Sequence, residues 1–263
     1  MGRLTRRAGV GLALLLAAAC GPGREEGLPA KAFVPVVIES RLPGRTPWQT
    51  RVVVTNPGTA AATVRLRRWP PDARPAEVET YAVAAGAARA IPLRIPLFPS
   101  VSSFLFESRE PLSVTASLRD RRGGGPPPLA VPVLDPRDLA RPGDTLRTGP
   151  LFWDAARRSR LVLTFPASER DVVPFRARIH VVGADGTPLA TVEHAVHGVP
   201  QLIEDPWAHY GLRDRRPIYV EVTLLGGTRG RKPVWGLWVS GLVADVATGE
   251  QRFVETSLRR AGG

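Results

Sequence analysis

The chain has almost no cysteine, few lysines and no long apolar run, and each shortage narrows the class of protein. Cys20 is the single cysteine among 263 residues, so no disulfide framework holds the fold. Lys31 and Lys232 are the only lysines among 36 basic residues, so arginine carries almost all of the net charge of +12. No segment reaches the ~20 consecutive apolar residues of a membrane-spanning helix. We therefore expect a water-soluble globular chain.

Motifs that carry catalysis are also missing. There is no Gly-x-Ser-x-Gly turn, and the glycine-rich stretch 226–232 lacks the spacing of a phosphate-binding loop. All four histidines lie in the second half: His180, His194, His197 and His209. Strand positions three apart point to opposite faces, so His194 and His197 are not expected to converge on a metal. We predict a non-enzymatic protein without cofactor or bound metal. A metal-dependent enzyme built on His194, His197, Asp205 and His209 is an alternative.

The first twenty residues have the pattern of an export signal. Arg3, Arg6 and Arg7 give a positive start, and an uncharged apolar run over 8–19 leads directly to Cys20. A charged start, a short apolar run and small residues before a cut are the marks of a secretory signal peptide. Small residues placed directly before a cysteine resemble the lipobox of bacterial lipoproteins.

The lipobox resemblance carries expectations about processing and place. It implies that residues 1–19 are removed and that Cys20 becomes the first residue of the mature protein and carries the lipid. Ala17 departs from the pattern, because it stands where lipoboxes most often have leucine. Gly21 is not the aspartate that keeps lipoproteins at the inner membrane in enteric bacteria. We therefore expect a protein of the bacterial cell envelope, lipid-anchored at the outer membrane.

The positive charge has two interpretations. Loss of residues 1–19 removes three arginines and leaves 33 basic against 24 acidic residues, a formal charge of about +9. Such a balance is typical of proteins that bind nucleic acid or an anionic surface. The preference for arginine, together with abundant alanine, glycine and proline, instead indicates the codon usage of a GC-rich genome. We predict no nucleic-acid partner; anionic lipid headgroups remain a possible contact, at up to ~1 kcal/mol per basic residue.

Short segments of alternating apolar and polar residues follow one another through the rest of the chain. In 63–69, Val64 and Leu66 alternate with arginines, the period-2 pattern of a strand with one buried face. Turn residues such as Asn-Pro-Gly at 56–58 separate these segments. Only 205–211 reads as a helical turn, with an aspartate to cap it, a proline at its first position and a glycine at its end. The pattern predicts an all-β protein.

Two segments share a more specific plan. The run Trp48-x-Thr-x-Val-x-Val-x-Asn-Pro-Gly, followed by a strand, resembles the opening of immunoglobulin-like modules of secreted bacterial proteins. Residues 159–166 take the place of 51–57 in a second copy, and 240–250 is similar to the terminal hairpin of these modules. The second copy departs from the first at Phe165, which stands where the first copy has asparagine. The resemblance, over 33–257, implies two tandem immunoglobulin-like β-sandwiches.

These observations divide the chain into six parts. The boundary between the two sandwiches is placed in a stretch rich in proline, glycine and aspartate, which is typical of a linker. The expected parts are a signal peptide (1–19), a flexible tether (20–31), a first sandwich (32–135), a linker (136–145), a second sandwich (146–258) and a tail (259–263).

Tryptophans supply one candidate binding feature. Trp235 and Trp238 stand three apart on an expected strand, so one is expected to fill the core and the other to face outward. An exposed indole beside basic residues can stack on a sugar or a peptide. Trp153 and Trp207 are further tryptophans that can join such a surface. The ordinary alternative is that all of them fill the core.

A basic loop supplies another candidate. Arg229, Arg231 and Lys232 lie in a glycine-rich connection between two expected strands. Such a loop is either a solvated hairpin tip or a place where backbone and side-chain donors hold an anion.

Together these features predict a non-catalytic, lipid-anchored envelope protein that serves as a binding, adhesion or assembly scaffold. Its expected contacts are the membrane, through the N-terminal lipid, and a protein or glycan partner. An exposed sheet edge can recruit a protein by adding a strand. The alternative is a carbohydrate-binding envelope module that uses exposed tryptophan.

Overall fold

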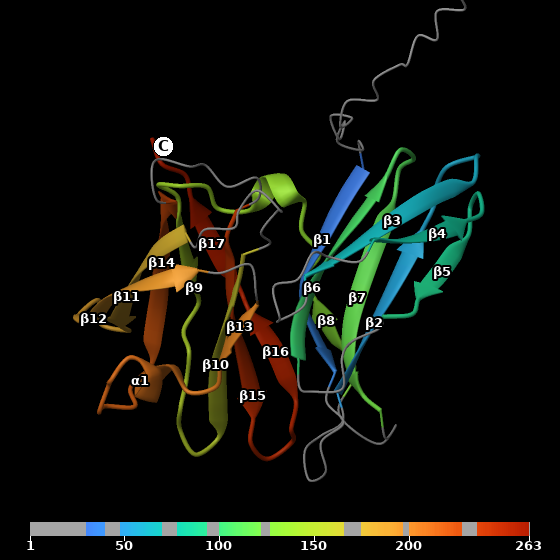
Figure 1. The fold of residues 1–263 in the computed structure, drawn as a ribbon. Helices are drawn as coiled ribbons and strands as arrows, with labels where there is room; N and C mark the ends of the chain where they lie inside the picture. The colour runs from blue at the N-terminus through green and yellow to red at the C-terminus, as the bar shows by residue number, and fades with distance from the viewer. Residues whose placement is uncertain are drawn as a thin grey trace, which may run out of the picture.

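The computed structural model describes residues 30–39, 48–69, 78–93, 100–121, 127–165, 175–196, 200–227 and 236–262. Within these ranges the regular structure consists of strands, except for one short helix, α1 (Pro206–His209), and one 3-10 turn, η1 (Pro136–Asp138). The prediction of an all-β protein is confirmed (Figure 1). No helix in the described ranges has the length and apolar character needed to span a membrane.

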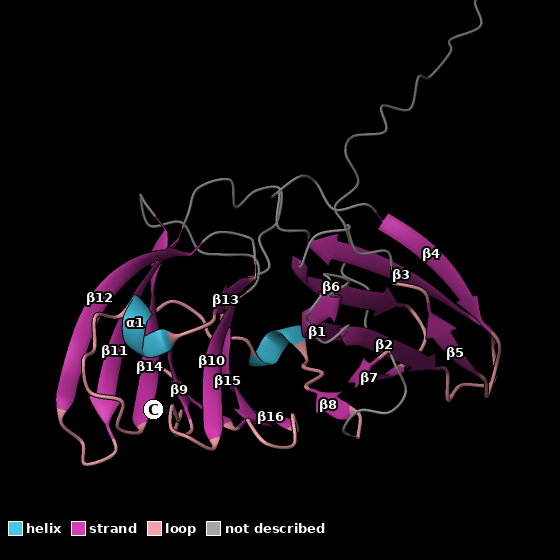
Figure 2. Cartoon of the chain, turned by 90° about the horizontal axis from the view of Figure 1, so that it is seen from below, coloured by secondary structure: helices cyan, strands magenta, loops and turns pink. Residues whose placement is uncertain are grey.

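The first half of the chain forms one sheet that folds over on itself. The strands join in the order β4-β3-β6-β1-β2-β7-β8, with β5 beside β2. The described pairing between β1 and β2 is a single register pair, Glu39 with Gln49, so the sheet turns at that corner into two layers (Figure 2). The strands are β1 (Ala30–Glu39), β2 (Trp48–Thr55), β3 (Ala62–Trp69), β4 (Val78–Val83), β5 (Ala88–Ile91), β6 (Ser100–Ser108), β7 (Ser113–Asp120) and β8 (Leu129–Val131).

Alternating apolar residues fill the space between these two layers. Val64 and Leu66 are buried while Arg65 lies half-buried beside them, as the period-2 pattern predicts. Phe104 and Phe106 of β6 enter the same core from the neighbouring strand. Every strand of the first half contributes to this one cluster, so the two layers enclose a single core.

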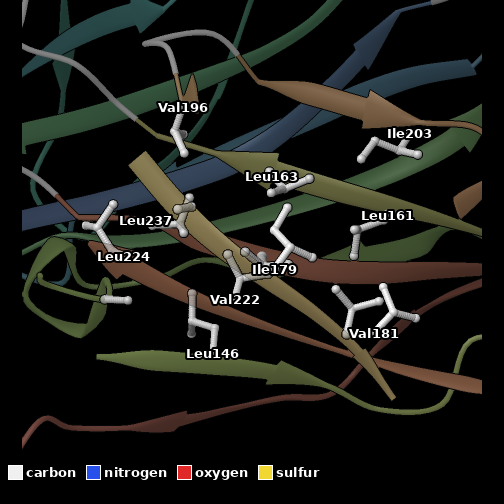
Figure 3. Packing of buried hydrophobic residues seen from close by; sticks show 14 of the residues in the cluster. Leu146, Leu161, Leu163, Ile179, Val181, Val196, Ile203, Val222, Leu224 and Leu237 are labelled. Atoms are coloured by element: carbon white, nitrogen blue, oxygen red, sulfur yellow. The ribbon is translucent and has the colours of Figure 1, made fainter. Parts of the chain in front are cut away.

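The second half forms two separate sheets that also face each other. Their orders are β13-β10-β15-β16 and β12-β11-β14-β9-β17. Buried side chains from both sheets, among them Leu161, Ile179 and Val222, form the largest cluster of the molecule (Figure 3). The strands are β9 (Thr145–Thr148), β10 (Arg157–Thr164), β11 (Phe175–Gly183), β12 (Pro188–Val196), β13 (Gln201–Ile203), β14 (Ile218–Gly227), β15 (Trp238–Asp245), β16 (Gln251–Val254) and β17 (Thr256–Arg259).

A third apolar cluster joins the two halves. We call it the seam: it contains Phe33, Val36, Leu105, Leu139, Val162 and Trp238, with Phe253 packed at its margin. Val162 faces the seam whereas its neighbours Leu161 and Leu163 face the core of the second half, so β10 is buried on both sides. A buried hydrogen bond from Thr164 Oγ1 to the carbonyl oxygen of Pro35, 3.0 Å long, crosses between the halves.

The stretch expected to be a linker, 136–145, is packed into the fold. It contains η1, and Leu139 and Ala140 within it are buried. Ala140 exchanges backbone hydrogen bonds of 2.8 and 2.9 Å with Leu237. Gly236 lies so close that a Cβ atom there would stand 2.3 Å from the carbonyl oxygen of Ala140. Residues 139 and 140 of this stretch are therefore in direct contact with the segment that precedes β15.

Both ends of the described chain are more ordered than the sequence suggests. β1 begins at Ala30, so the last two residues of the expected tether 20–31 already lie in the sheet. At the other end, β17 includes Arg259, the first residue of the expected tail. Arg260 donates through Nη1 to Asp144 Oδ2 at 2.8 Å, which fixes the chain beyond β17 to the segment that precedes β9.

Candidate functional site

Most of the predicted binding residues fall outside the described ranges. These are the lipid-attachment residue Cys20, the aromatic Trp235 and the loop residues Arg229, Arg231 and Lys232. Trp238 is described, and its side chain is 6% exposed. It lies in the seam with its ring 6.4 Å from that of Phe253 in an edge-on arrangement. The spacing of Trp235 and Trp238 predicts that one of the two fills the core. Trp238 is buried in this way and exposes no ring surface to a ligand.

The histidines are engaged in separate contacts. His194 Nε2 lies 2.6 Å from Gln201 Oε1 and links β12 to β13, while His180 Nδ1 lies 2.9 Å from Thr191 Oγ1. The rings of His194 and His209 are 6.3 Å apart, and Asp205 is turned toward an arginine instead. In the described part of the chain, no three histidine, cysteine, aspartate or glutamate side chains are grouped to hold a metal ion. His197 lies outside that part.

The structure brings a different set of side chains together at the end of the second half. We call it the Trp153 cluster: Trp153, Trp207, Arg158, Arg215 and Asp205. Trp153 is half-buried and packs against the core. The centroids of the Trp153 and Trp207 rings are 6.0 Å apart at an interplanar angle of 58°. The cluster presents a partly exposed indole that rests on a buried one.

Helix α1 positions the buried member. Asp205 caps the helix by accepting a hydrogen bond of 3.0 Å from the N–H of Ala208, and Pro206 stands at the first helical turn, as predicted. Gly211, at a φ of +70°, allows the chain to turn away after the helix. Trp207 is fully buried, and its indole Nε1 donates to the carbonyl oxygen of Arg216 at 3.0 Å. The four-residue helix therefore holds Trp207 rigidly beneath Trp153.

A tight turn before β10 positions the exposed member. Asp154 Oδ1 accepts from the N–H groups of Ala156 and Arg157 at 2.9 and 2.7 Å, an Asx-type turn. Trp153 forms an isolated bridge with Arg158 across this turn. The guanidinium of Arg157 lies 3.7 Å from the ring centroid of Phe152 and pairs with Asp154 at 2.6 Å. The backbone that carries Trp153 is thus held on both sides.

Two guanidinium groups flank the Trp153 ring. The Cζ atom of Arg215 is 4.8 Å from the ring centroid and that of Arg158 is 5.1 Å away, both within cation–π range. Arg215 Nη1 also contacts both oxygens of Asp205, at 2.7 and 2.8 Å. Burial raises the pKa of Asp205, but its bonds to Arg215 and to the N–H of Ala208 outweigh that effect and lower the pKa below the usual value. Asp205 is therefore a charged, occupied acceptor at neutral pH.

The Trp153 cluster and the start of β1 lie at opposite ends of the molecule. In Figure 1 the start of β1 and the C-terminus are at one end, and α1 is at the other. A protein anchored through residues that precede β1 would present the α1 end away from its anchor.

The arrangement is suited to binding. Its described members are an indole face, arginine donors and a carboxylate that is already paired, and none of these is an activated nucleophile. An aromatic face with fixed polar groups at its edge is the chemistry of non-covalent recognition. The sequence pointed to Trp153 and Trp207 only as tryptophans that could join another surface. The available signal was the Asp-Pro-Trp helix start together with an aromatic pair at 152–153 between arginine-rich segments.

Comparisons with known proteins add no identity. No protein-family model matches the chain, and no curated protein matches it in sequence. Among solved structures, a lectin from Pleurotus ostreatus in complex with GalNAc superposes with a TM-score of 0.22 and 13% identity, covering 89% of this chain and 86% of the lectin. The apo form of the same lectin gives a TM-score of 0.22 and 12% identity over the same shares. Superpositions this poor establish no common fold, so the following proposals rest on the residues themselves.

Proposed function

We propose that this protein is a non-catalytic, lipid-anchored protein of the bacterial cell envelope that binds carbohydrate through the Trp153 cluster. The observation that carries the proposal is a half-buried indole fixed on a buried tryptophan and flanked by two guanidinium groups. The scaffold would be two immunoglobulin-like sandwiches joined at the seam. The lipid on Cys20 and the tether behind it would hold the α1 end away from the membrane.

Carbohydrate is the ligand class that this geometry favours. A pyranose ring has one face of C–H groups, which stack on an indole, and a rim of hydroxyl groups, which need hydrogen-bond partners. The cluster supplies the indole and, over its ring, the donor-rich side chains of Arg158 and Arg215. The fixed turn and helix lower the entropy lost on binding, because the receptor is already ordered.

The first test replaces the exposed indole. In an array of immobilised glycans probed with the detergent-solubilised full chain, Trp153→Ala is expected to weaken every bound glycan about 5- to 150-fold. This range corresponds to the 1–3 kcal/mol that stacking of a base on an aromatic side chain typically contributes, which we take as the guide for a sugar ring. Trp153→Phe retains a ring and is expected to lose less. Thermal unfolding followed by circular dichroism verifies that each variant is folded.

Tyr219 offers a matched control for this test. It is a half-buried aromatic residue on the outer face of β14 with the Arg147 guanidinium 4.6 Å from its ring centroid, so it repeats the aromatic and arginine pair outside the Trp153 cluster. Tyr219→Ala is expected to leave glycan binding unchanged. Equal losses in the Tyr219 and Trp153 variants, or full binding by folded Trp153→Ala, would contradict the assignment of the site.

The second test concerns the anchor. Expressed in a bacterium with lipoprotein processing, the wild-type chain is expected in the outer-membrane fraction, and Cys20→Ala is expected to leave it for the soluble periplasmic fraction. Fractionation by density gradient with immunoblotting measures the change. A Cys20→Ala variant that stays in the membrane fraction would contradict the proposed lipid anchor. It would not bear on the proposed glycan site.

One observation favours a second candidate, an assembly scaffold. β12 is nine residues long, and within the described residues it pairs on one side only, with β11. A strand of this length with a free edge is a template for adding a partner strand. Capture of an envelope protein that persists in Trp153→Ala but is lost when proline replaces Val192, in the middle of β12, would favour this role.

A further inference from the structure

The two arginines beside Trp153 are held in different ways. Arg215 is tied to Asp205 by two contacts from one nitrogen, of 2.7 and 2.8 Å. Arg158 makes a single hydrogen bond, from Nη1 to the carbonyl oxygen of its neighbour Arg157 at 3.0 Å, besides its contact with the indole. In the described part of the chain no carboxylate pairs with Arg158. Its charge is therefore the one in the cluster that is not neutralised by the protein.

The surrounding charges do not supply the missing partner. The neighbouring arginines are already matched: Arg157 with Asp154 at 2.6 Å, Arg160 with Glu204 at 2.6 Å, and Arg216 with Asp185 at 3.2 Å and Asp214 at 3.0 Å. Hydrogen bonds from Arg157 lower the pKa of Asp154, so this carboxylate is charged and committed to its own turn. The guanidinium of Arg158, which no described carboxylate neutralises, thus stands over the half-buried indole of Trp153.

A sugar ring would reach the indole most readily by displacing Arg158. Moving Arg215 would break its pairing with Asp205, which also caps α1. Moving Arg158 breaks one hydrogen bond to a backbone carbonyl and leaves its guanidinium at the rim of the bound ring. An anionic group on the sugar would restore two charge-assisted hydrogen bonds there, because guanidinium and carboxylate match each other in a fork.

We infer that the Trp153 cluster selects an acidic glycan, with the sugar ring on Trp153 and a sugar carboxylate on Arg158. This inference rests on the proposed carbohydrate site and adds the ligand's charge to it. The net charge of about +9 that remains without residues 1–19 acts in the same direction, because a positive field raises the encounter rate with a polyanion. Selection by charge at an exposed site is sensitive to salt, since the Debye length falls from about 10 Å at 0.1 M to about 3 Å at 1 M.

A matched pair of ligands separates charge from sugar shape. The probes are a galacturonic acid hexamer and the same hexamer with every carboxylate methyl-esterified, titrated calorimetrically into the detergent-solubilised full chain. The wild type is expected to bind the acid about tenfold more tightly than the ester at 50 mM salt, as one charge-assisted hydrogen-bonded pair supplies. Most of this preference is expected to disappear at 1 M salt.

A matched pair of variants assigns the preference to one residue. Arg158→Gln is expected to lose the preference for the acid, because its loss of affinity for the acid exceeds its loss for the ester. Arg51→Gln, which removes the same charge from an exposed position on β2, is expected to behave as the wild type. Equal affinity of the wild type for acid and ester overturns the inference, as does an equal loss for both ligands in Arg158→Gln. Binding of neither hexamer overturns it as well, whereas the Trp153→Ala array result decides separately whether the carbohydrate site exists.

Discussion

Trp238→Ala is expected to lower the free energy of unfolding by about 3–5 kcal/mol, the usual loss for removing a buried tryptophan side chain from a core. Trp238 is 6% exposed and is the largest side chain of the seam. Alanine would leave a cavity among Val162, Leu105 and the edge of Phe253. Because this cavity lies between the halves, the change should also weaken their coupling. Guanidinium titration of the wild type is expected to show one transition, and that of the variant two.

Two controls define this result. Trp238→Phe keeps an aromatic ring in the seam and is expected to lose less stability and to keep the single transition. Val246→Ala removes apolar volume from a side chain that is 52% exposed in the turn after β15, and it is expected to change stability by no more than about 0.5 kcal/mol. One transition at the wild-type midpoint in Trp238→Ala would show that the seam does not couple the halves.

The seam also marks the limit of prediction from sequence. Alternation in 63–69 correctly placed Val64 and Leu66 inward, because one face of β3 meets a core and the other meets polar groups. Residues 161–165 are all buried, and such a continuous run is equally compatible with a strand of a single large core. Both sides of β10 are covered because one side meets the core of the second half and the other meets the seam. Contacts between sheets that are far apart in sequence leave no local signal.

Two short polar strands were not predicted, because they too depend on partners that are distant in the sequence. β9 (Thr145–Thr148) and β17 (Thr256–Arg259) contain two apolar residues between them, Leu146 and Leu258, which are opposite each other in the ladder. Their strand state comes from pairing with one another and from β14, not from intrinsic pattern. The departure at Phe165 has a clear outcome: its side chain is buried against Phe175 at 5.0 Å. Its counterpart Asn56 instead holds a turn with its amide.

The site required the fold before it could be found. Trp153 and Trp207 are distant in sequence, and neither stands in a recognised motif. Their contact depends on the turn that begins β10 and on the short helix after β13 meeting at one end of the sandwich. The capping aspartate and the proline at the start of α1 predict the helix from the sequence. They do not predict that Trp153 packs against it. Any aromatic or arginine residue in the sequence is a candidate for a binding site. Only the three-dimensional arrangement distinguishes a buried tryptophan such as Trp238 from a partly exposed one such as Trp153.

Asp144→Ala is expected to lower the free energy of unfolding by about 1–3 kcal/mol, the usual cost of leaving buried hydrogen-bond donors unsatisfied. Asp144 is 4% exposed and accepts from the N–H of Arg141 at 2.8 Å and of Ala261 at 2.9 Å, besides its bond to Arg260. Removing the carboxylate leaves these donors unsatisfied and frees the chain after β17. Asp144→Asn, which keeps the shape and one acceptor, is expected to lose less.

The same residue gives a pH dependence of known sign. Burial raises the pKa of Asp144, but the N–H groups of Arg141 and Ala261 and the guanidinium of Arg260 outweigh burial and lower it. A carboxylate whose pKa is lower in the folded state stabilises the fold above its unfolded pKa, about 3.9, and this contribution is lost as the pH falls through the folded value. The stability difference between wild type and Asp144→Asn, measured by urea unfolding, should therefore be largest at pH 7 and shrink toward pH 2. A difference that stays constant over this range would show that the carboxylate's charge does not hold the C-terminal segment.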